Sequence, residues 1–381
     1  MSAVQATPRV SGRLHELDAL RGIAALGVVA WHYRWHFGAT PFATLLHPFY
    51  NAGFLFVDFF FVLSGLVIAR AYWREPRQWR FVANVQARIA RLYPLHLLTL
   101  VVTALLLAGL PAGANSPEFV RATDDAKHFA LNLLLLNQSG LQDDWSFNTP
   151  AWSISAEFLV NVVFLAIIAM ATRARIVACV LVALAGVALW VAGPRPIVSG
   201  QYVFGAIDVQ LLRCFLAFGA GVGVQLWLDR FGGRALLERW PRTTPWLALA
   251  ALVALFAVLS LSTRRPPISH YLVSIFVSAA CVAFVPFGGL LKRMLQVRVL
   301  TFLGDISYST YLVHYPLQLA LYVAGAWGLF RLDYASPLVF LGFFGLVIAV
   351  SSATHYGVEM PGQRWLLERF APARASSPSV P

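Results

Sequence analysis

The sequence predicts an all-α integral membrane protein with about ten transmembrane helices and with both the N-terminus and the C-terminus in the cytoplasm. The first observation is composition: of 381 residues, 59% are hydrophobic and only 12% are charged, whereas soluble domains carry about 25% charged residues. The second is the length of the apolar runs. A helix needs about 20 apolar residues to cross a hydrocarbon core of about 30 Å, and ten runs of about this length follow one another along the chain.

The ten runs alternate with shorter, more polar segments. They lie near residues 18–37, 50–72, 92–110, 151–172, 175–193, 207–228, 244–262, 268–289, 302–328 and 336–358. The apolar stretch 128–138 is only half long enough to span, and we interpret it as interfacial or re-entrant. Residues 1–12 and 371–381 are small, polar and contain proline, which is typical of flexible tails. Residues 13–370 are therefore expected to form one transmembrane domain.

Basic residues indicate the orientation. With the N-terminus inside, the cytoplasmic segments hold most of the 29 Lys and Arg residues, as the positive-inside bias requires. If 128–138 crossed the membrane, every later loop would change sides and this bias would be reversed downstream. The net charge of +12 thus indicates cytoplasmic loops that contact membrane lipids, not nucleic acid. Cys179, Cys214 and Cys281 are too widely spaced to indicate disulfides or a metal site.

The first apolar run carries ionisable residues, which are costly in lipid unless they are paired, hydrated or used. Arg21 and His32 are eleven residues apart, close to three helical turns, so they share one face about 16 Å apart along the axis. Asp18 can pair with Arg21 on that face. Taken alone, His32 is more often an interfacial histidine among aromatic residues. His36 follows four residues later, but no third ligand stands at a recognisable spacing, so no metal site is predicted.

The segment LDALRGIAALGVVAWH, in which ten residues separate the arginine from the histidine, resembles the first-helix signature of the membrane-bound acyltransferase family 3. Five further segments resemble family motifs in the expected order. They are Asp58 to Gly65, Arg88 to Pro94, Pro150 to Phe158, Ser307 to Pro316 and Glu359 to Pro361. The resemblance implies a bacterial inner-membrane enzyme that moves an acyl group, in particular acetyl, from acyl-coenzyme A to a hydroxyl of a carbohydrate such as an exopolysaccharide or lipopolysaccharide.

The resemblance also implies catalytic residues. Acyl transfer from a thioester needs a base for the acceptor hydroxyl, and the family pattern assigns this role to His32, acting directly or as a covalent acyl carrier. Glu157 is expected to orient His32 or to neutralise a charged partner, and the alternative is a carboxylate that favours a helix start. Asp58 lies within an apolar run, where it needs a partner; we expect Arg21, in a catalytic or a bracing role.

The donor is expected to bind at the cytoplasmic side. Arg88 and Arg91 share a helix face, and arginine forks bind phosphate oxygens such as those of coenzyme A. The alternative for these residues is a topology signal with lipid headgroup contact. Arg21 is assigned to the same donor set. The late helix adds Tyr308, Tyr311 and His314, for which hydrogen bonding between helices is an equal alternative.

Two other functions remain open from the residues. In the first, the chain is a transporter in which His32, Asp58 and Glu157 form a proton relay. In the second, the acyl-transfer chemistry is kept but the acceptor is a macrolide, a peptide or a lipid. Thioester-dependent acyl transfer, compared with solute flux in liposomes, distinguishes an enzyme from a transporter.

Overall fold

A computed structural model describes residues 12–73, 81–114, 119–170, 175–177, 202–203, 207–263 and 268–370, and the single positions 180, 184 and 187. Its long helices are α1 (His15–Phe37), α3 (Phe56–Tyr72), α4 (Phe81–Ala108), α6 (Trp152–Ile168), α8 (Val209–Arg230), α10 (Thr244–Leu261), α11 (Ile268–Phe284), α14 (Ser307–Ala326) and α15 (Pro337–Thr354). Shorter helices are α2 (Ala43–Ala52), α5 (Ala126–Leu133), α9 (Gly233–Arg239), α12 (Leu290–Leu295), α13 (Arg298–Asp305) and α16 (Met360–Phe370). The structure also has short 3-10 and π turns and the paired strands β1 (Tyr202–Val203) and β2 (Ile207–Asp208).

Seven helical runs are long and apolar enough to cross a membrane. They are Ala43–Tyr72, Phe81–Ala108, Thr149–Ile168, Val209–Arg230, Thr244–Leu261, Ser269–Phe287 and Pro337–Phe370. α1 and α14 coincide with two more predicted runs, although their polar and ionisable side chains lower their hydropathy. The tenth predicted run, 175–193, lies largely outside the described residues. The prediction of a multi-pass α-helical protein is confirmed, whereas the count of ten and the side of each terminus stay predictions.

Several predicted boundaries differ from the structure. The second run begins at Ala43 rather than near residue 50, since α2 precedes α3 with only a 3-10 turn between them. The last run continues past 358 through a π-helical turn to Phe370. In the stretch 128–138, residues 128–133 form most of α5, whose eight residues give a length of about 12 Å, too short to span a bilayer.

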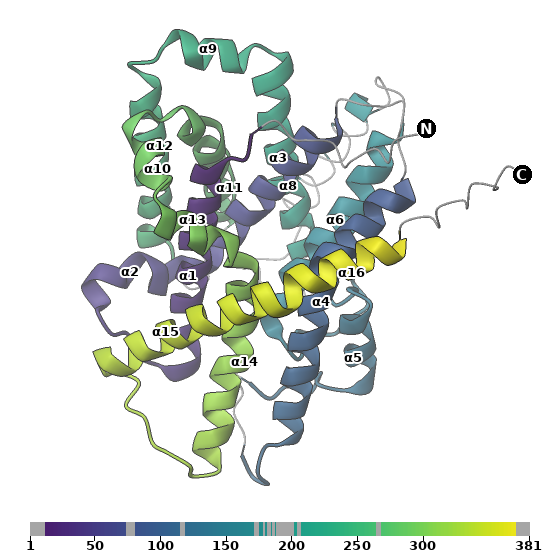
Figure 1. Ribbon diagram of the computed structural model, residues 1–381, viewed down its shortest axis with the longest axis vertical. Coiled ribbons are helices and arrows are strands. Elements are labelled where there is room, and N and C mark those ends of the chain that lie inside the picture. The colour runs from purple at the N-terminus through teal and green to yellow at the C-terminus, as the bar shows by residue number, and fades with distance from the viewer. Residues whose placement is uncertain are drawn as a thin grey trace, which may run out of the picture.

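The helices form one bundle whose two ends differ (Figure 1). The short helices α9 and α12 lie at the upper end, and the loops that follow α4 and α14 lie at the lower end. The first pair belongs to segments predicted to be cytoplasmic, and the second pair to segments predicted to be extracytoplasmic. The arrangement in space therefore agrees with the alternation that the charge distribution predicts.

Reporter fusions test this orientation. Fusions after Gly113 and Arg331 should report an extracytoplasmic position, and fusions after Arg234 and Lys292 a cytoplasmic one, because the positive-inside bias places the basic loops inside. A fusion after Arg234 that reported an extracytoplasmic position would overturn the predicted ten-span topology.

Glycines set the tightest helix contact in the bundle, between α3 and α8. A Cβ atom on Gly65 would collide with the carbonyl oxygen of Phe218, and one on Gly221 would collide with the carbonyl oxygen of Val62. Small residues at such crossings let two backbones approach closely, which is how helices associate when lipid is the solvent. The contact fixes the direction of α3, and α3 forms one wall of the cavity described below.

Candidate active site

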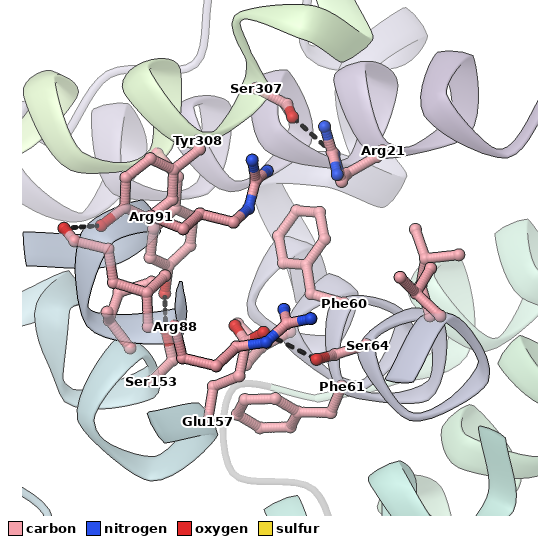
Figure 2. A pocket seen from close by; sticks show the side chains of 16 residues that line it. Arg21, Phe60, Phe61, Ser64, Arg88, Arg91, Ser153, Glu157, Ser307 and Tyr308 are labelled. Carbon is pink, nitrogen blue, oxygen red and sulfur yellow. Dashed lines mark hydrogen bonds between the residues drawn. The ribbon is translucent and has the colours of Figure 1, made fainter. Parts of the chain in front are cut away.

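A cavity of about 330 Å³ lies where α1, α3, α4, α6 and α14 meet. Its lining contains Arg21 from α1, Arg88 and Arg91 from α4, and the carboxylate of Glu157 from α6. Figure 2 shows these groups around one shared space, with the ring of Phe60 beside them. The structure therefore brings together the three arginines predicted to hold the donor, although they come from two separate helices.

Arg21 is positioned by the close packing of α1 against α13. Its Nε donates a hydrogen bond to Oγ of Ser307 at 2.7 Å, and its Nη2 donates to the carbonyl oxygen of Gly304 at 2.8 Å. The neighbouring Gly22 makes this approach possible, because a Cβ atom there would lie 2.7 Å from the nitrogen of Gly304. Oδ1 of Asp18 lies 3.9 Å from Nη2 of Arg21. The predicted pairing of these two residues within the first helix is confirmed.

Arg88 and Arg91 lie three residues apart near the start of α4, and both line the cavity. The guanidinium of Arg88 also lies over the ring of Tyr72, 5.9 Å from its centroid. Beside them, the hydroxyl of Tyr308 donates to the carbonyl oxygen of Leu92 at 2.6 Å, which ties α14 to α4. Guanidinium forks on one helix face, with the third arginine on another wall, suit the binding of phosphate oxygens.

Glu157 belongs to the same cavity and does not contact His32 in the described part of the chain. Its Oε1 accepts a hydrogen bond from Oγ of Ser64 at 2.7 Å, and both residues line the cavity. The single carboxylate offsets part of the positive charge of the arginines. Of the two roles expected for Glu157, the geometry favours that of neutralising charged partners.

Asp58 forms a buried ion pair with Arg213, so the prediction that Arg21 is its partner is wrong. Nε of Arg213 donates to Oδ1 of Asp58 at 2.6 Å, and both side chains are almost completely buried. The guanidinium also reaches the carbonyl oxygen of Phe54 at 3.4 Å and lies 4.5 Å from the ring centroid of Tyr271. Arg21 is held by α13 instead. Asp58 is not among the residues that line the cavity, and its contact braces α3 against α8.

His32 on α1 and His314 on α14 form a buried pair. Nε2 of His314 lies 3.1 Å from Nδ1 of His32. Between the pair and the cavity stands Tyr311, which lines the cavity and whose ring centroid is 6.0 Å from that of His314. The Tyr311 hydroxyl is fixed by Oγ of Ser153 at 2.8 Å and the carbonyl oxygen of Pro150 at 3.1 Å. His314 was predicted to bind the donor, but the structure places it against His32 and not in the cavity wall.

The proton relay considered for a transporter needs His32, Asp58 and Glu157 in contact, and the three side chains have different partners. Among the described residues, His32 contacts His314, Asp58 contacts Arg213, and Glu157 contacts Ser64. The geometry therefore gives the relay no support.

His36 lies one turn beyond His32 and has contacts of its own. Its Nδ1 lies 2.7 Å from Oε1 of Gln318, and its ring centroid lies 4.5 Å from that of Phe119. In the part of the chain that the structure describes, no three His, Cys, Asp or Glu residues group closely enough to hold a metal ion.

The segment 119–149 packs over the bundle near the histidine pair. Nδ2 of Asn148 donates to the carbonyl oxygen of Leu312 at 3.0 Å, two residues before His314. Within the segment, the backbone N–H and the ring of His128 bind the carboxylate of Asp125 and lower the pKa of that carboxyl. Because this pKa is lowered, the contact is present at neutral pH and is lost as the pH falls through it.

Sequence reasoning missed several residues at these sites. Phe60, Ser64 and Ser153 stand inside the quoted motifs, so their position there was the available signal. Arg213 is recognisable as a basic residue within a predicted span, but nothing in the sequence pairs it with Asp58. These partners are hidden because each contact joins segments that are far apart along the chain.

Comparisons with known proteins agree with this geometry. A model of acyltransferase family 3, described as an acyltransferase domain, matches residues 14–356. The chain is 35% identical over 161 residues to "Protein 2 in picA locus" of Rhizobium radiobacter, and the aligned region covers 39% of this chain and 78% of that protein. It is 33% identical over 164 residues to "Acyltransferase MdmB" of Streptomyces mycarofaciens, and the aligned region covers 41% of this chain and 39% of that protein. No solved structure matches the chain. Because the family match includes both the cavity and the histidine pair, the chain belongs to acyltransferase family 3 and is a membrane acyltransferase.

Proposed function

We propose that this acyltransferase takes an acyl group, in particular acetyl, from acyl-coenzyme A and transfers it to a hydroxyl group of a carbohydrate. The observation that carries the proposal is the convergence of three arginines on one cavity that reaches Tyr311, one helical turn before the buried His314. Coenzyme A carries its phosphates at one end and its thioester at the other. A site for it therefore needs cations at one end and a base near the other.

The first helix carries both a cation and a base, separated along its axis. Arg21 and His32 are eleven residues apart on α1, which corresponds to about 16 Å along the helix axis. Arg88 and Arg91 lie near the end of α4 that is predicted to be cytoplasmic, where the donor is available. Phosphates bound there leave the pantetheine arm to extend through the cavity toward Tyr311.

In the proposed reaction, His32 acts as the general base. It takes the proton of the acceptor hydroxyl as the oxygen attacks the thioester carbonyl carbon, which gives a tetrahedral intermediate. The intermediate collapses with cleavage of the carbon–sulfur bond, and the protonated His32 returns the proton to the coenzyme A thiolate. The alternative route places the acyl group first on a nitrogen of His32 and then on the hydroxyl.

The acceptor is proposed to approach from the extracytoplasmic side of a bacterial inner membrane. The histidine pair lies toward the segment 119–149, whose buried amide side chains include Asn148 and Gln138. Amide and aromatic groups are suited to sugar hydroxyls, which both donate and accept hydrogen bonds. A macrolide, peptide or lipid acceptor would be detected in the test below as the loss of another acetylated metabolite.

The function is tested with purified protein in liposomes and acetyl-coenzyme A. The free thiol of coenzyme A should be released over many turnovers only when an acceptor is present, and mass spectrometry of glycans from a deletion strain should show one missing O-acetyl group. Unchanged glycans, with another acetylated metabolite lost instead, would reject the carbohydrate acceptor. The absence of thioester cleavage with every acceptor offered would reject the coenzyme A donor.

Replacing both Arg88 and Arg91 with glutamine should raise the Kd for acetyl-coenzyme A by about 100-fold. Each charge-assisted phosphate contact typically contributes about 1.5–3 kcal/mol, which is about tenfold in affinity or more. Isothermal titration of the purified variant gives the Kd. The matched control is the double replacement of Arg239 and Arg242, which are exposed and do not line the cavity. Equal losses in both double variants would mean that only diffuse positive charge matters.

A further inference from the structure

The contacts of the two paired histidines define which ring nitrogens carry protons. Nδ1 of His314 lies 3.2 Å from the carbonyl oxygen of Thr310, one turn earlier on α14. Nδ1 of His32 lies 3.1 Å from the carbonyl oxygen of Val28, one turn earlier on α1. A carbonyl oxygen can only accept a hydrogen bond. Both rings therefore carry their proton on Nδ1 when they are neutral.

This assignment also makes the contact between the two rings chemically consistent. Nε2 of His314 is then unprotonated and accepts from Nδ1–H of His32, the two atoms being 3.1 Å apart. The same N–H of His32 is shared with the carbonyl oxygen of Val28. Nε2 of His32 is left with its lone pair, and no hydrogen bond occupies it among the described residues. The opposite tautomers would turn lone pairs of both Nδ1 atoms toward carbonyl oxygens.

We propose that His314 is the positioning residue of the acyl transfer: it fixes the Nδ1–H tautomer of His32, so that Nε2 of His32 is the atom that takes the proton of the acceptor hydroxyl. The proposal rests on the proposed role of His32 as the base. When Nε2 takes that proton, the imidazolium of His32 keeps its Nδ1–H bond to Nε2 of His314. The proton on Nε2 then passes to the leaving thiolate, and His314 gains and loses none.

The surroundings of the pair explain why the partner is an imidazole. The rings packed against it include those of Trp31 and His36 on α1 and Tyr311 on α14. The titratable side chains that face it are His36 and Tyr311, and the described contacts of the pair include no carboxylate. A neutral acceptor orients His32 without placing a second charge in an apolar bundle, where an unpaired carboxylate is costly.

Two replacements of His314 test the proposal. His314→Ala should lower kcat by about 10- to 1000-fold, less than the roughly 10⁴-fold loss from the wrong tautomer in a serine protease triad, because Val28 still accepts from His32. His314→Gln should recover at least about tenfold over the alanine variant, since its amide oxygen can accept from Nδ1–H of His32. The KM for acetyl-coenzyme A should change by less than about threefold in both, because His314 does not line the donor cavity.

A control and a direct readout separate positioning from packing. His96→Ala removes another buried histidine that binds a backbone carbonyl, that of Asn132 in α5, and should leave kcat near that of the wild type. Nitrogen-15 NMR of histidine-labelled protein should show His32 as the Nδ1–H tautomer in the wild type and a mixture in His314→Ala. A normal kcat in His314→Ala, or glutamine no better than alanine in variants of unchanged melting temperature, overturns the proposal. If His32→Ala itself keeps full activity, the proposed role of His32 as the base fails instead, and if the wild type cleaves no thioester the proposed function fails, so these failures are distinguishable.

Discussion

His32→Ala should lower the kcat of acyl transfer by about 10²–10⁴-fold, the usual loss when a general base is removed. The thermal stability of the variant should stay close to that of the wild type, because the side chain is one of a polar pair and not part of the apolar core. Release of the coenzyme A thiol measures the rate, and thermal unfolding in detergent measures stability. An alanine variant that keeps near-normal activity would show that the chemistry is centred elsewhere.

The matched control is His36→Ala, one turn further along the same helix. The ring of His36 packs beside that of His32, but its hydrogen bond goes to Gln318. Its replacement should therefore change kcat by less than about tenfold, below the loss expected when a general base is removed. Acyl-labelled donor without acceptor distinguishes the two routes. Label retained on the wild type and absent from His32→Ala would indicate the covalent route, and its absence from both would indicate direct transfer.

Gly221→Leu should have the largest effect on stability of any substitution considered. Even a Cβ atom at this position collides with the backbone of Val62 on α3, so α3 and α8 must move apart. Overpacking typically costs about 1–3 kcal/mol, and a clash against backbone rather than a flexible side chain belongs at or above the top of that range. We expect loss of folded protein or a melting temperature lowered by several degrees, measured by size-exclusion chromatography after heating.

Gly223→Leu is the control for this experiment. Gly223 lies on the same helix, is exposed, and has no atom within 4 Å of the position that its Cβ would take. The same added volume there should be tolerated, because it extends toward lipid. Equal destabilisation by the two leucines would mean that a bulky side chain anywhere on α8, and not the contact with α3, explains the loss.

The membrane architecture was predictable because the hydropathy and charge of each residue can be read directly from the sequence. The helix boundaries were less predictable. Pro48 suggests a helix end, yet it lies inside α2, and the 3-10 turn that follows α2 leads into α3 without a loop. The π-helical turn at the end of α15 lets the last helix continue to Phe370, and its register shift has no signature in composition.

The candidate site was predictable in its residues but not in its pairings. The family motifs contain Arg21, His32 and Glu157, and the spacing of Asp18 and Arg21 predicted their contact. The pairing of Asp58 with Arg213 joins residues 155 positions apart, and the sequence carries no information on which buried cation a buried carboxylate meets. On α14, Tyr308 and Tyr311 line the cavity, whereas His314 lies beyond its wall. The sequence does not show where along this helix the cavity ends.

The buried pair between α3 and α8 also constrains the order in which the protein is made. Asp58 is synthesised 155 residues before Arg213, and at about 5–20 residues per second it waits roughly 8–30 s for its partner. During this interval a carboxylate in lipid costs about 2.5–3.5 kcal/mol on insertion scales. The apolar residues of α3 offset this cost, but the nascent helix gains from staying at the insertion machinery, or from keeping its carboxyl protonated, until α8 arrives. Biogenesis of this enzyme therefore includes a step in which an early helix is completed by a much later one.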